Sequence, residues 1–217
     1  MIHSGLTRLT RCAMALAVAG VLAGCAPLLV GGAVVGGTLV ATDRRTTGIQ
    51  LEDQSIELKA ASRVDDLATL GHINVVSYNR ILLITGEVPT AGEKARVERA
   101  VATLENVRGV VNELGIGNNS TYGSRSTDAM LGAKVTATFV DAPDLQANAY
   151  KVVLERGIVY LMGRVTEREA NRATDLARSV SGVQKVVRVF EIISEAELAN
   201  LGGAAAPTPA AGASAPR

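Results

Sequence analysis

The fold is decided by two stretches of the sequence, NVVSYNRILLITGEV at residues 74–88 and KVVLERGIVYLMGRV at residues 151–165. They align without a gap at a constant offset of 77 residues. Each stretch has two apolar, largely alternating runs around a short polar segment, Tyr78-Asn79-Arg80 in one and Glu155-Arg156-Gly157 in the other. This pattern is typical of a β-hairpin. The sequence therefore predicts the same hairpin twice.

The segments around each hairpin repeat as well. Apolar residues at helical spacing precede and follow each hairpin, and a further apolar strand comes last, at 110–116 or at 183–192. The helical positions are Ile56, Ala60, Val64 and Leu67, then Val97, Ala100, Val101, Leu104 and Val107 in the first copy, and Leu131, Val135 and Phe139, then Ala170, Ala173, Leu176, Ala177 and Val180 in the second. Each copy therefore has the order αββαβ. We expect an α+β fold of two tandem sandwich modules, each with its helices on one face of a small sheet.

Local signals mark the ends of the second helix in each copy. Thr166, with Glu169 three residues later, has the pattern of a capping box. Gly109 and Gly182 are expected to stop the helices.

The chain begins with the features of a secretory leader. Arg8 and Arg11 precede an apolar stretch from Ala13 to Ala23, as in a signal peptide. The following Leu22-Ala23-Gly24-Cys25 resembles the bacterial lipobox. That resemblance implies cleavage before Cys25, a diacylglycerol on its thiol and an acyl chain on the new amino terminus.

Residues 26–42 contain small residues and two Gly pairs, and they are short for a membrane span. Two alternatives remain open for this segment. It is a flexible tether above the lipid, or a glycine-faced helix that packs in the membrane or on itself.

Composition excludes several classes of function. The formal net charge of +1 gives no reason to expect a nucleic-acid partner. No cysteine follows Cys25, and His72 is the only histidine beyond residue 3, so the body lacks the residues of a Cys/His metal site. No nucleophile-elbow or phosphate-loop pattern occurs. We therefore expect no enzymatic activity, no metal and no cofactor, and we interpret His72 as a solvated loop residue.

The αββαβ units resemble the BON domain. The similarity includes Asp-x-x-Ile or Asp-x-x-Leu in the first helix and a Gly after the hairpin. Two such units behind a lipobox resemble the dual BON-domain outer-membrane lipoproteins of Gram-negative bacteria, the DolP (YraP) family. ATDRRTTGIQLED at 41–53 and VYLMGRVTEREA at 159–170 carry much of this similarity. The resemblance implies a lipid-anchored protein of the outer membrane that faces the periplasm and maintains envelope integrity. It also implies that the first helix of the second domain binds anionic phospholipid.

The boundaries that follow are a signal peptide at 1–24, a lipidated Cys25 with a Gly-rich tether at 25–48, a first BON domain at 49–117, a linker at 118–125, a second BON domain at 126–194 and a disordered Ala/Pro-rich tail at 195–217.

A comparison of the two first helices points to a lipid face in the second copy. Aligned at Asp53 and Asp128, the second helix has Met130 and Ala137 where the first has Ser55 and Ser62. The predicted lipid-binding residues are Met130, Ala133, Lys134 and Ala137, with Arg125 as a second cation. An amphipathic helix of this kind suits the boundary between headgroups and acyl chains.

A second function remains open at this stage. The same helix, or the edge strands of the sheets, could dock protein partners of outer-membrane assembly or of peptidoglycan remodelling at division, which would make the protein a scaffold.

Overall fold

The computed structural model describes residues 43–67 and 70–203, with the side chains of 202 and 203 excepted. The leader, Cys25, the segment 26–42 and the tail from residue 204 lie outside the described residues. Contacts divide the chain into Met1–Val40 and Ala41–Arg217, and both modules belong to the second of these units. A chain that begins at Ala41 therefore keeps every contact described below, and we expect it to fold by itself.

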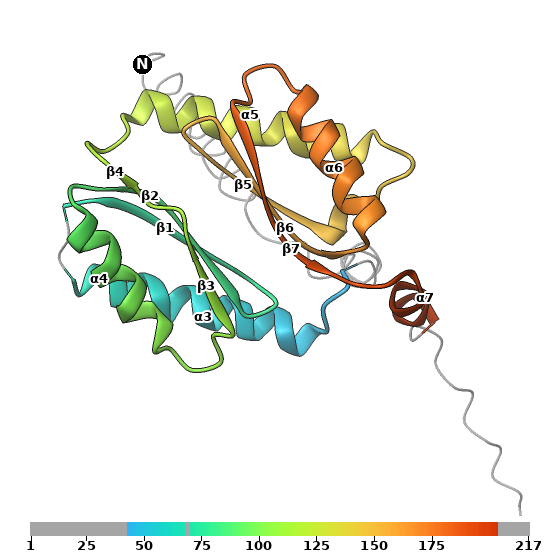
Figure 1. Ribbon diagram of the computed structural model, residues 1–217, viewed down its shortest axis with the longest axis horizontal. Coiled ribbons are helices and arrows are strands. Elements are labelled where there is room, and N and C mark those ends of the chain that lie inside the picture. The colour runs from blue at the N-terminus through green and yellow to red at the C-terminus, as the bar shows by residue number, and fades with distance from the viewer. Residues whose placement is uncertain (1–42, 68–69, 204–217) are drawn as a thin grey trace, which may run out of the picture. The chain divides into compact units, whose positions relative to one another are not determined.

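The first module has two helices and one small sheet (Figure 1). Its elements are α3 (Thr47–Asp65), β1 (His72–Tyr78), β2 (Ile81–Val88), α4 (Ala91–Ala102), β3 (Gly109–Asn112) and β4 (Gly115–Ile116). Strands β1 and β2 form the predicted antiparallel hairpin. Strands β3 and β4 both pair with β2 in parallel, because α4 carries the chain back to the start of the sheet.

The second module repeats this order. Its elements are α5 (Tyr122–Val140), the short 3-10 helix η1 (Ala147–Ala149), β5 (Tyr150–Glu155), β6 (Ile158–Val165), α6 (Glu167–Ser179), β7 (Lys185–Ile192) and α7 (Glu195–Gly203). The sheet has the order β5-β6-β7, with an antiparallel hairpin and a parallel last strand. The predicted fold class, two tandem αββαβ modules, is confirmed.

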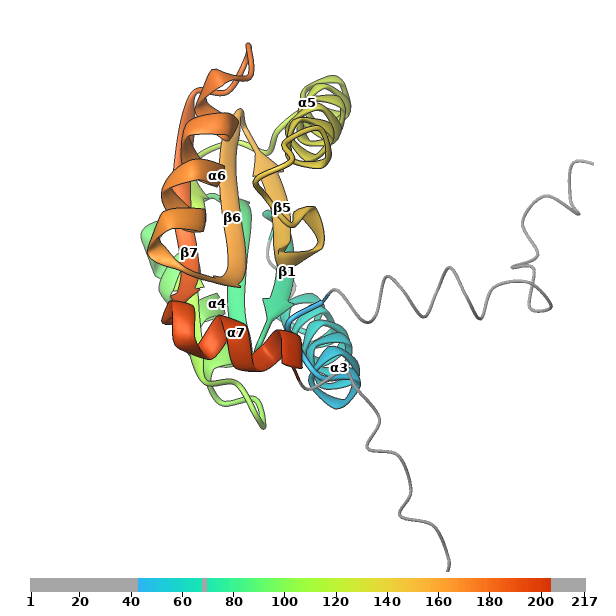
Figure 2. The same cartoon turned by 90° about the vertical axis from the view of Figure 1, so that its right-hand side faces the viewer.

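Each module buries its helices against one face of its own sheet. Ile56, Ala60 and Val64 of α3 lie in the first core, and Leu131 (8% exposed), Val135 and Phe139 of α5 are buried in the second module. Helix α6 contributes three alanines, Ala170, Ala173 and Ala177, and lies along β6 and β7 (Figure 2). The predicted capping box is also confirmed, since the Thr166 side chain accepts from the Glu169 N–H and the Glu169 carboxylate accepts from the Thr166 N–H.

A buried aspartate joins each first helix to the hairpin of its module. The hairpin turns have positive φ at Asn79 and Arg80 and at Arg156 and Gly157, as two-residue type I′ turns require. Their backbone N–H groups point at the preceding helix. Asp128 accepts from both residues of its turn, at 2.7 and 2.9 Å.

Asp53 accepts from four donors. Its carboxylate bonds the N–H groups of Asn79 and Arg80, both at 2.8 Å, the Ser77 hydroxyl at 2.7 Å and the Arg45 guanidinium at 2.8 Å. Asp53 is only 2% exposed, so these four donors replace the water that its carboxylate loses on burial. The Asp-x-x-Ile and Asp-x-x-Leu motifs therefore hold helix and hairpin together.

The sheet faces turned away from the helices share a third apolar cluster. Its buried members are Tyr78, Leu83, Val153, Tyr160 and Met162, which come from both modules. Ion pairs surround this cluster, among them Lys151–Glu57 at 2.7 Å and Arg156–Glu87 at 3.5 Å. The two modules are thus packed into one unit by their sheets.

Two adjacent arginines before α3 each bind a different module. Arg44 forms a two-pronged ion pair with Glu169, both bonds 2.7 Å, and donates to the Arg164 carbonyl at 2.8 Å. Arg45 bonds Asp53 and lies 4.0 Å from the centre of the Tyr78 ring. Although burial alone would raise the pKa of Glu169, the hydrogen bond and charge of Arg44 hold it below its ordinary value.

Several boundaries differ from the sequence prediction. Helix α3 begins at Thr47, inside the predicted tether 25–48, and the predicted strand 110–116 is divided into β3 and β4. Helix α5 begins at Tyr122, inside the predicted linker 118–125, because the Thr121 side chain caps it by accepting from the Ser124 N–H. Residues 195–203 of the predicted disordered tail form α7, where Glu197 pairs with Arg164 at 2.7 Å. Gly109 does not stop a helix: α4 ends at Ala102 and Gly109 opens β3.

We predict that Asp53→Ala lowers the free energy of unfolding by about 3 kcal/mol or more, because several buried donors lose their acceptor at about 1–3 kcal/mol each. Asp128→Ala should cost less, since it releases two donors and not four. Urea unfolding followed by circular dichroism measures both. Asp65→Ala, at an exposed position of the same α3 helix, is the control and should change stability by less than about 0.5 kcal/mol. Equal small effects for all three variants would contradict the assigned role of the aspartates.

Removing the negative charge of another buried carboxyl group, Glu155, is predicted to raise the stability of the protein. Burial, together with the negative charges of Glu87 and Asp128, raises the pKa of Glu155, while Arg156 and Arg125 lower it by less. A carboxyl whose pKa is raised by folding contributes stability below its unfolded pKa, and this contribution is lost as the pH rises through the folded value. Glu155→Gln should therefore raise the urea midpoint at neutral pH, and the gain should shrink to nothing at acidic pH. A variant that is less stable than the parent at neutral pH would refute this.

Candidate lipid-facing site

The outward face of α5 brings together four of the five predicted lipid-binding residues. Asp128, Leu131, Val135 and Phe139 turn inward and are buried. Helical geometry places Met130, Ala133, Lys134 and Ala137 on the opposite side, where all four are exposed. Met130 is 65% exposed. The structure thus presents one contiguous face with apolar side chains and a cation.

Two aromatic or branched residues that were not predicted extend this face. Tyr122 is 85% exposed at the start of α5, and Val140 is 66% exposed at its end. They lie 11 residues before and 7 residues after Ala133, about three and two helical turns, and so share its side. Tyr122 was missed because the helix was expected to begin at 126. Helical spacing could have identified Val140.

The exposed charge of α5 has one sign. The helix has three charged residues, Arg125, Asp128 and Lys134, and the carboxylate of Asp128 is buried against the hairpin turn. Within the part of the chain that the structure describes, the ion pairs include no partner for Lys134. The face therefore offers an unneutralised ammonium group beside apolar side chains.

Arg125 does not lie with the other four. It is half-buried and donates to the Ser120 carbonyl at 3.3 Å, and its Nη1 lies 3.4 Å from Nδ1 of His72. Its guanidinium is also 4.7 Å from the centre of the Tyr122 ring. His72 is the first residue of β1 and not a loop residue, so the interpretation of His72 as a solvated loop histidine was wrong.

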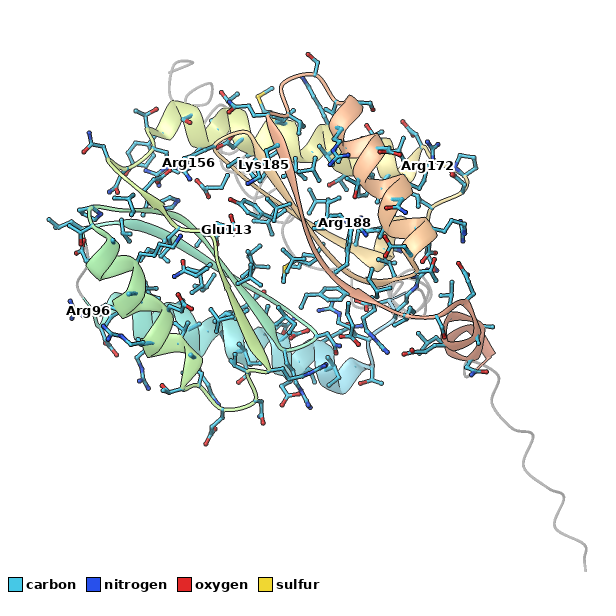
Figure 3. All side chains as sticks on the ribbon, in the orientation of Figure 1. Arg96, Glu113, Arg156, Arg172, Lys185 and Arg188 are labelled. Carbon is cyan, nitrogen blue, oxygen red and sulfur yellow. The ribbon has the colours of Figure 1, made fainter. Side chains whose placement is uncertain are left out.

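A depression of about 650 Å³ lies beside the outward face. Met130 and Lys134 of α5 form one side of it, and Gly157, Ser181 and Gln184 form the other. Arg156 also lines it and extends from the hairpin turn toward β4 (Figure 3). There the guanidinium occupies the space left free by the missing side chain of Gly115.

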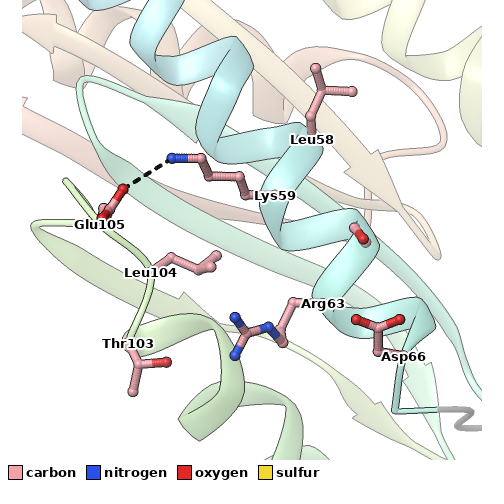
Figure 4. A pocket seen from close by; sticks show the side chains of 8 residues that line it. Leu58, Lys59, Arg63, Asp66, Thr103, Leu104 and Glu105 are labelled. Atoms are coloured by element: carbon pink, nitrogen blue, oxygen red, sulfur yellow. Dashed lines mark hydrogen bonds and ion pairs between the residues drawn. The ribbon is translucent and has the colours of Figure 1, made fainter.

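The corresponding helix of the first module, α3, differs in charge more than in apolar exposure. Leu51 is 61% exposed and Leu58 is 74% exposed, so α3 also presents apolar groups, which the comparison of the two helices had not predicted. Its Lys59, however, pairs with Glu105 at 3.3 Å (Figure 4). The depression of about 590 Å³ at this place also contains Asp66 and Arg63, so its charges are mixed. The exposed faces of the two helices therefore differ in charge: that of α5 is cationic, and that of α3 is mixed.

Other chemistry is not assembled in the described residues. Between residues 43 and 203, apart from 68–69, no group of three or more His, Cys, Asp or Glu side chains has a metal-binding arrangement. Over the same ranges, no helix combines the length and the apolar character that crossing a bilayer requires. Cys25, the predicted lipidation site, lies outside the described residues.

Comparisons with known proteins agree with this architecture. The family model of the BON domain matches residues 52–118 and 127–194. The chain is 38% identical over 176 residues to the outer membrane lipoprotein DolP of Haemophilus influenzae, covering 79% of this chain and 90% of that protein. It is 30% identical over 154 residues to a 21 kDa hemolysin of Actinobacillus pleuropneumoniae, covering 70% and 79%.

Among solved structures, CdsD, a structural protein of the type III secretion system of Chlamydia trachomatis, is 12% identical with a TM-score of 0.29, covering 73% of this chain and 99% of that chain. The duplicated αββαβ units, the aspartate that holds each hairpin, and the two family matches lead to one conclusion: the chain belongs to the BON-domain family, as a dual BON-domain protein similar to DolP.

Proposed function

We propose that this protein is a lipid-anchored outer-membrane lipoprotein that faces the periplasm and maintains envelope integrity without enzymatic activity. The name of the Haemophilus influenzae relative supports the location and the anchor. In this proposal the second BON domain binds the surface of an anionic phospholipid membrane through the outward face of α5.

One observation carries the lipid contact. Met130, Ala133 and Ala137 are exposed beside Lys134, and the helix has no exposed acidic group between Tyr122 and Val140. Apolar side chains can enter the headgroup boundary, while a cation near an anionic surface contributes about 1 kcal/mol. An unpaired lysine keeps this contribution, whereas Lys59 of α3 has the negative carboxylate of Glu105 beside it at 3.3 Å.

The contact should be weak when the body is free and effective when it is anchored. The outward face lacks Trp and Phe, which are strong interfacial groups. In the proposal, acylation of Cys25 holds the body at the bilayer, and several acyl chains anchor a protein stably where one chain does not. Anchoring then makes the binding of α5 effectively intramolecular, so modest affinity suffices.

We predict that the chain from residue 41 binds vesicles that contain anionic phospholipid, and that Met130→Glu and Lys134→Glu each weaken binding about fivefold or more, because each adds a negative charge to the face. Co-sedimentation with vesicles measures the affinity. The binding should also weaken with added salt, since the attraction between exposed charges is screened.

Ser55→Glu and Lys59→Glu are the matched controls, because these α3 residues stand at the positions equivalent to Met130 and Lys134 and are likewise exposed. They should leave vesicle binding within about twofold of the parent. Equal losses of vesicle affinity in the α3 and α5 variants would mean that binding depends only on the net charge of the protein and not on the outward face of α5. Unchanged vesicle affinity in both α5 variants would show that α5 is not the lipid-binding site.

The proposed anchor has its own test. Mass spectrometry of the mature protein from bacterial membranes should find an amino terminus at Cys25 that carries a diacylglycerol and an N-acyl chain. Cys25→Ala should leave the chain uncleaved or release it from the membrane fraction. A mature protein that keeps residues 1–24 and has no acyl group would contradict the proposal.

A further inference from the structure

The contact between His72 and Arg125 suggests how the lipid face is regulated. Arg125 and Lys134 are nine residues apart in α5, about two and a half turns, so they flank the outward face on opposite sides. Lys134 is exposed, whereas Arg125 is half-buried at the edge of the face, where His72, the Ser120 carbonyl and the Tyr122 ring contact it. One of the two flanking cations is thus withdrawn from the face.

This contact requires a neutral imidazole. At 3.4 Å, Nη1 of Arg125 can donate to Nδ1 of His72 only when Nδ1 has no proton. A protonated His72 has no acceptor to offer and places a second positive charge against the guanidinium. Protonation therefore turns an attraction into a repulsion.

The surroundings of His72 decide when this happens. The charged groups that face it are Arg125 from α5, Glu87 from β2, which lies opposite His72 in the hairpin register, and Asp65 from the end of α3, which lines a shallow depression with it. Glu87 is engaged elsewhere, since it accepts from Ser120 and pairs with Arg156. Burial and the charge of Arg125 lower the pKa of His72, and Glu87 opposes them by less.

The Arg125 side chain can move toward solvent when the contact with His72 is broken. It lies in the first turn of α5, next to the exposed Tyr122, and its Nε is buried without a hydrogen-bond partner among the described residues. Moving outward would satisfy this nitrogen with water or phosphate. It would also add a second cation to the rim of the face that already contains Lys134.

We propose that His72 is a pH-sensitive latch, which holds Arg125 away from the lipid face when neutral and releases it toward anionic headgroups when protonated. This inference rests on the proposed function, because it needs α5 to contact lipid. Acidification then strengthens membrane binding through one added cation, which corresponds to about a fivefold gain.

The test compares the chain from residue 41 with its His72→Asn variant. Asparagine keeps an acceptor near the place of Nδ1 but has no proton to gain in this range. Binding to vesicles of phosphatidylcholine with phosphatidylglycerol is measured near pH 7.5 and near pH 5, and circular dichroism checks folding at both. We expect equal binding near pH 7.5, and an acid-induced gain about fivefold larger in the parent than in the variant.

A second measurement follows the arginine itself. In an NMR titration of the parent, the Arg125 Nε–Hε signal should shift together with the His72 imidazole, and it should not shift in His72→Asn. The same acid-induced gain in both proteins would overturn the latch.

The failure of the latch can be told apart from the failure of the lipid contact. Binding that is sensitive to Met130→Glu but independent of pH overturns the latch and leaves the lipid contact standing. No binding to anionic vesicles at either pH overturns both.

Discussion

The structure depends on a carboxylate that accepts the backbone N–H groups of a tight turn. A type I′ turn directs two N–H groups at the helix that precedes the hairpin, and in each module an aspartate of that helix meets them. The bond fixes the rotation of the helix as well as its position, because Asp128 can reach the turn from one side of α5 only. Once Asp128 faces inward, Met130 and Lys134 must face outward. The same interaction that closes the core therefore sets which surface of α5 faces outward, and with it the face of the proposed lipid contact.

Duplication kept this interaction and let the outward faces diverge. Asp53 and Asp128 occupy equivalent places, and both first helices expose apolar groups and a lysine. The difference lies in what the lysines meet. Lys59 is neutralised by Glu105, which follows α4, while the loop after α6 offers Ser181 and Gln184 to the corresponding depression. A short loop far from the helix in sequence thus separates a mixed-charge surface from a cationic one.

Local patterns predicted the fold, but not the contacts that tie its parts together. Apolar alternation and helical spacing were enough for both hairpins and for the helices that cover them, because these depend on neighbours in sequence. Arg44 and Glu169 are 125 residues apart, and no periodicity relates them. Arg125 was predicted as a lipid cation because the sequence shows only its place at the start of a helix. Its partner His72 becomes visible when the two modules pack. Helix α7 was missed for the same reason, since Arg164 from β6 holds it.

The segment just before α3 contacts both modules. Arg44 and Arg45 are adjacent, yet Arg44 binds the capping-box carboxylate of the second module and Arg45 binds the turn-holding aspartate of the first. The start of α3 is therefore attached to both modules, through Arg44 to the second and through Arg45 to the first. Neither module can swing on a loose linker while these bonds and the cluster between the sheets persist. A membrane anchor in this part of the chain would consequently position the whole two-domain unit. In the proposed lipid contact, the direction in which α5 faces would then follow from where Arg44 and Arg45 attach, at Glu169 and Asp53.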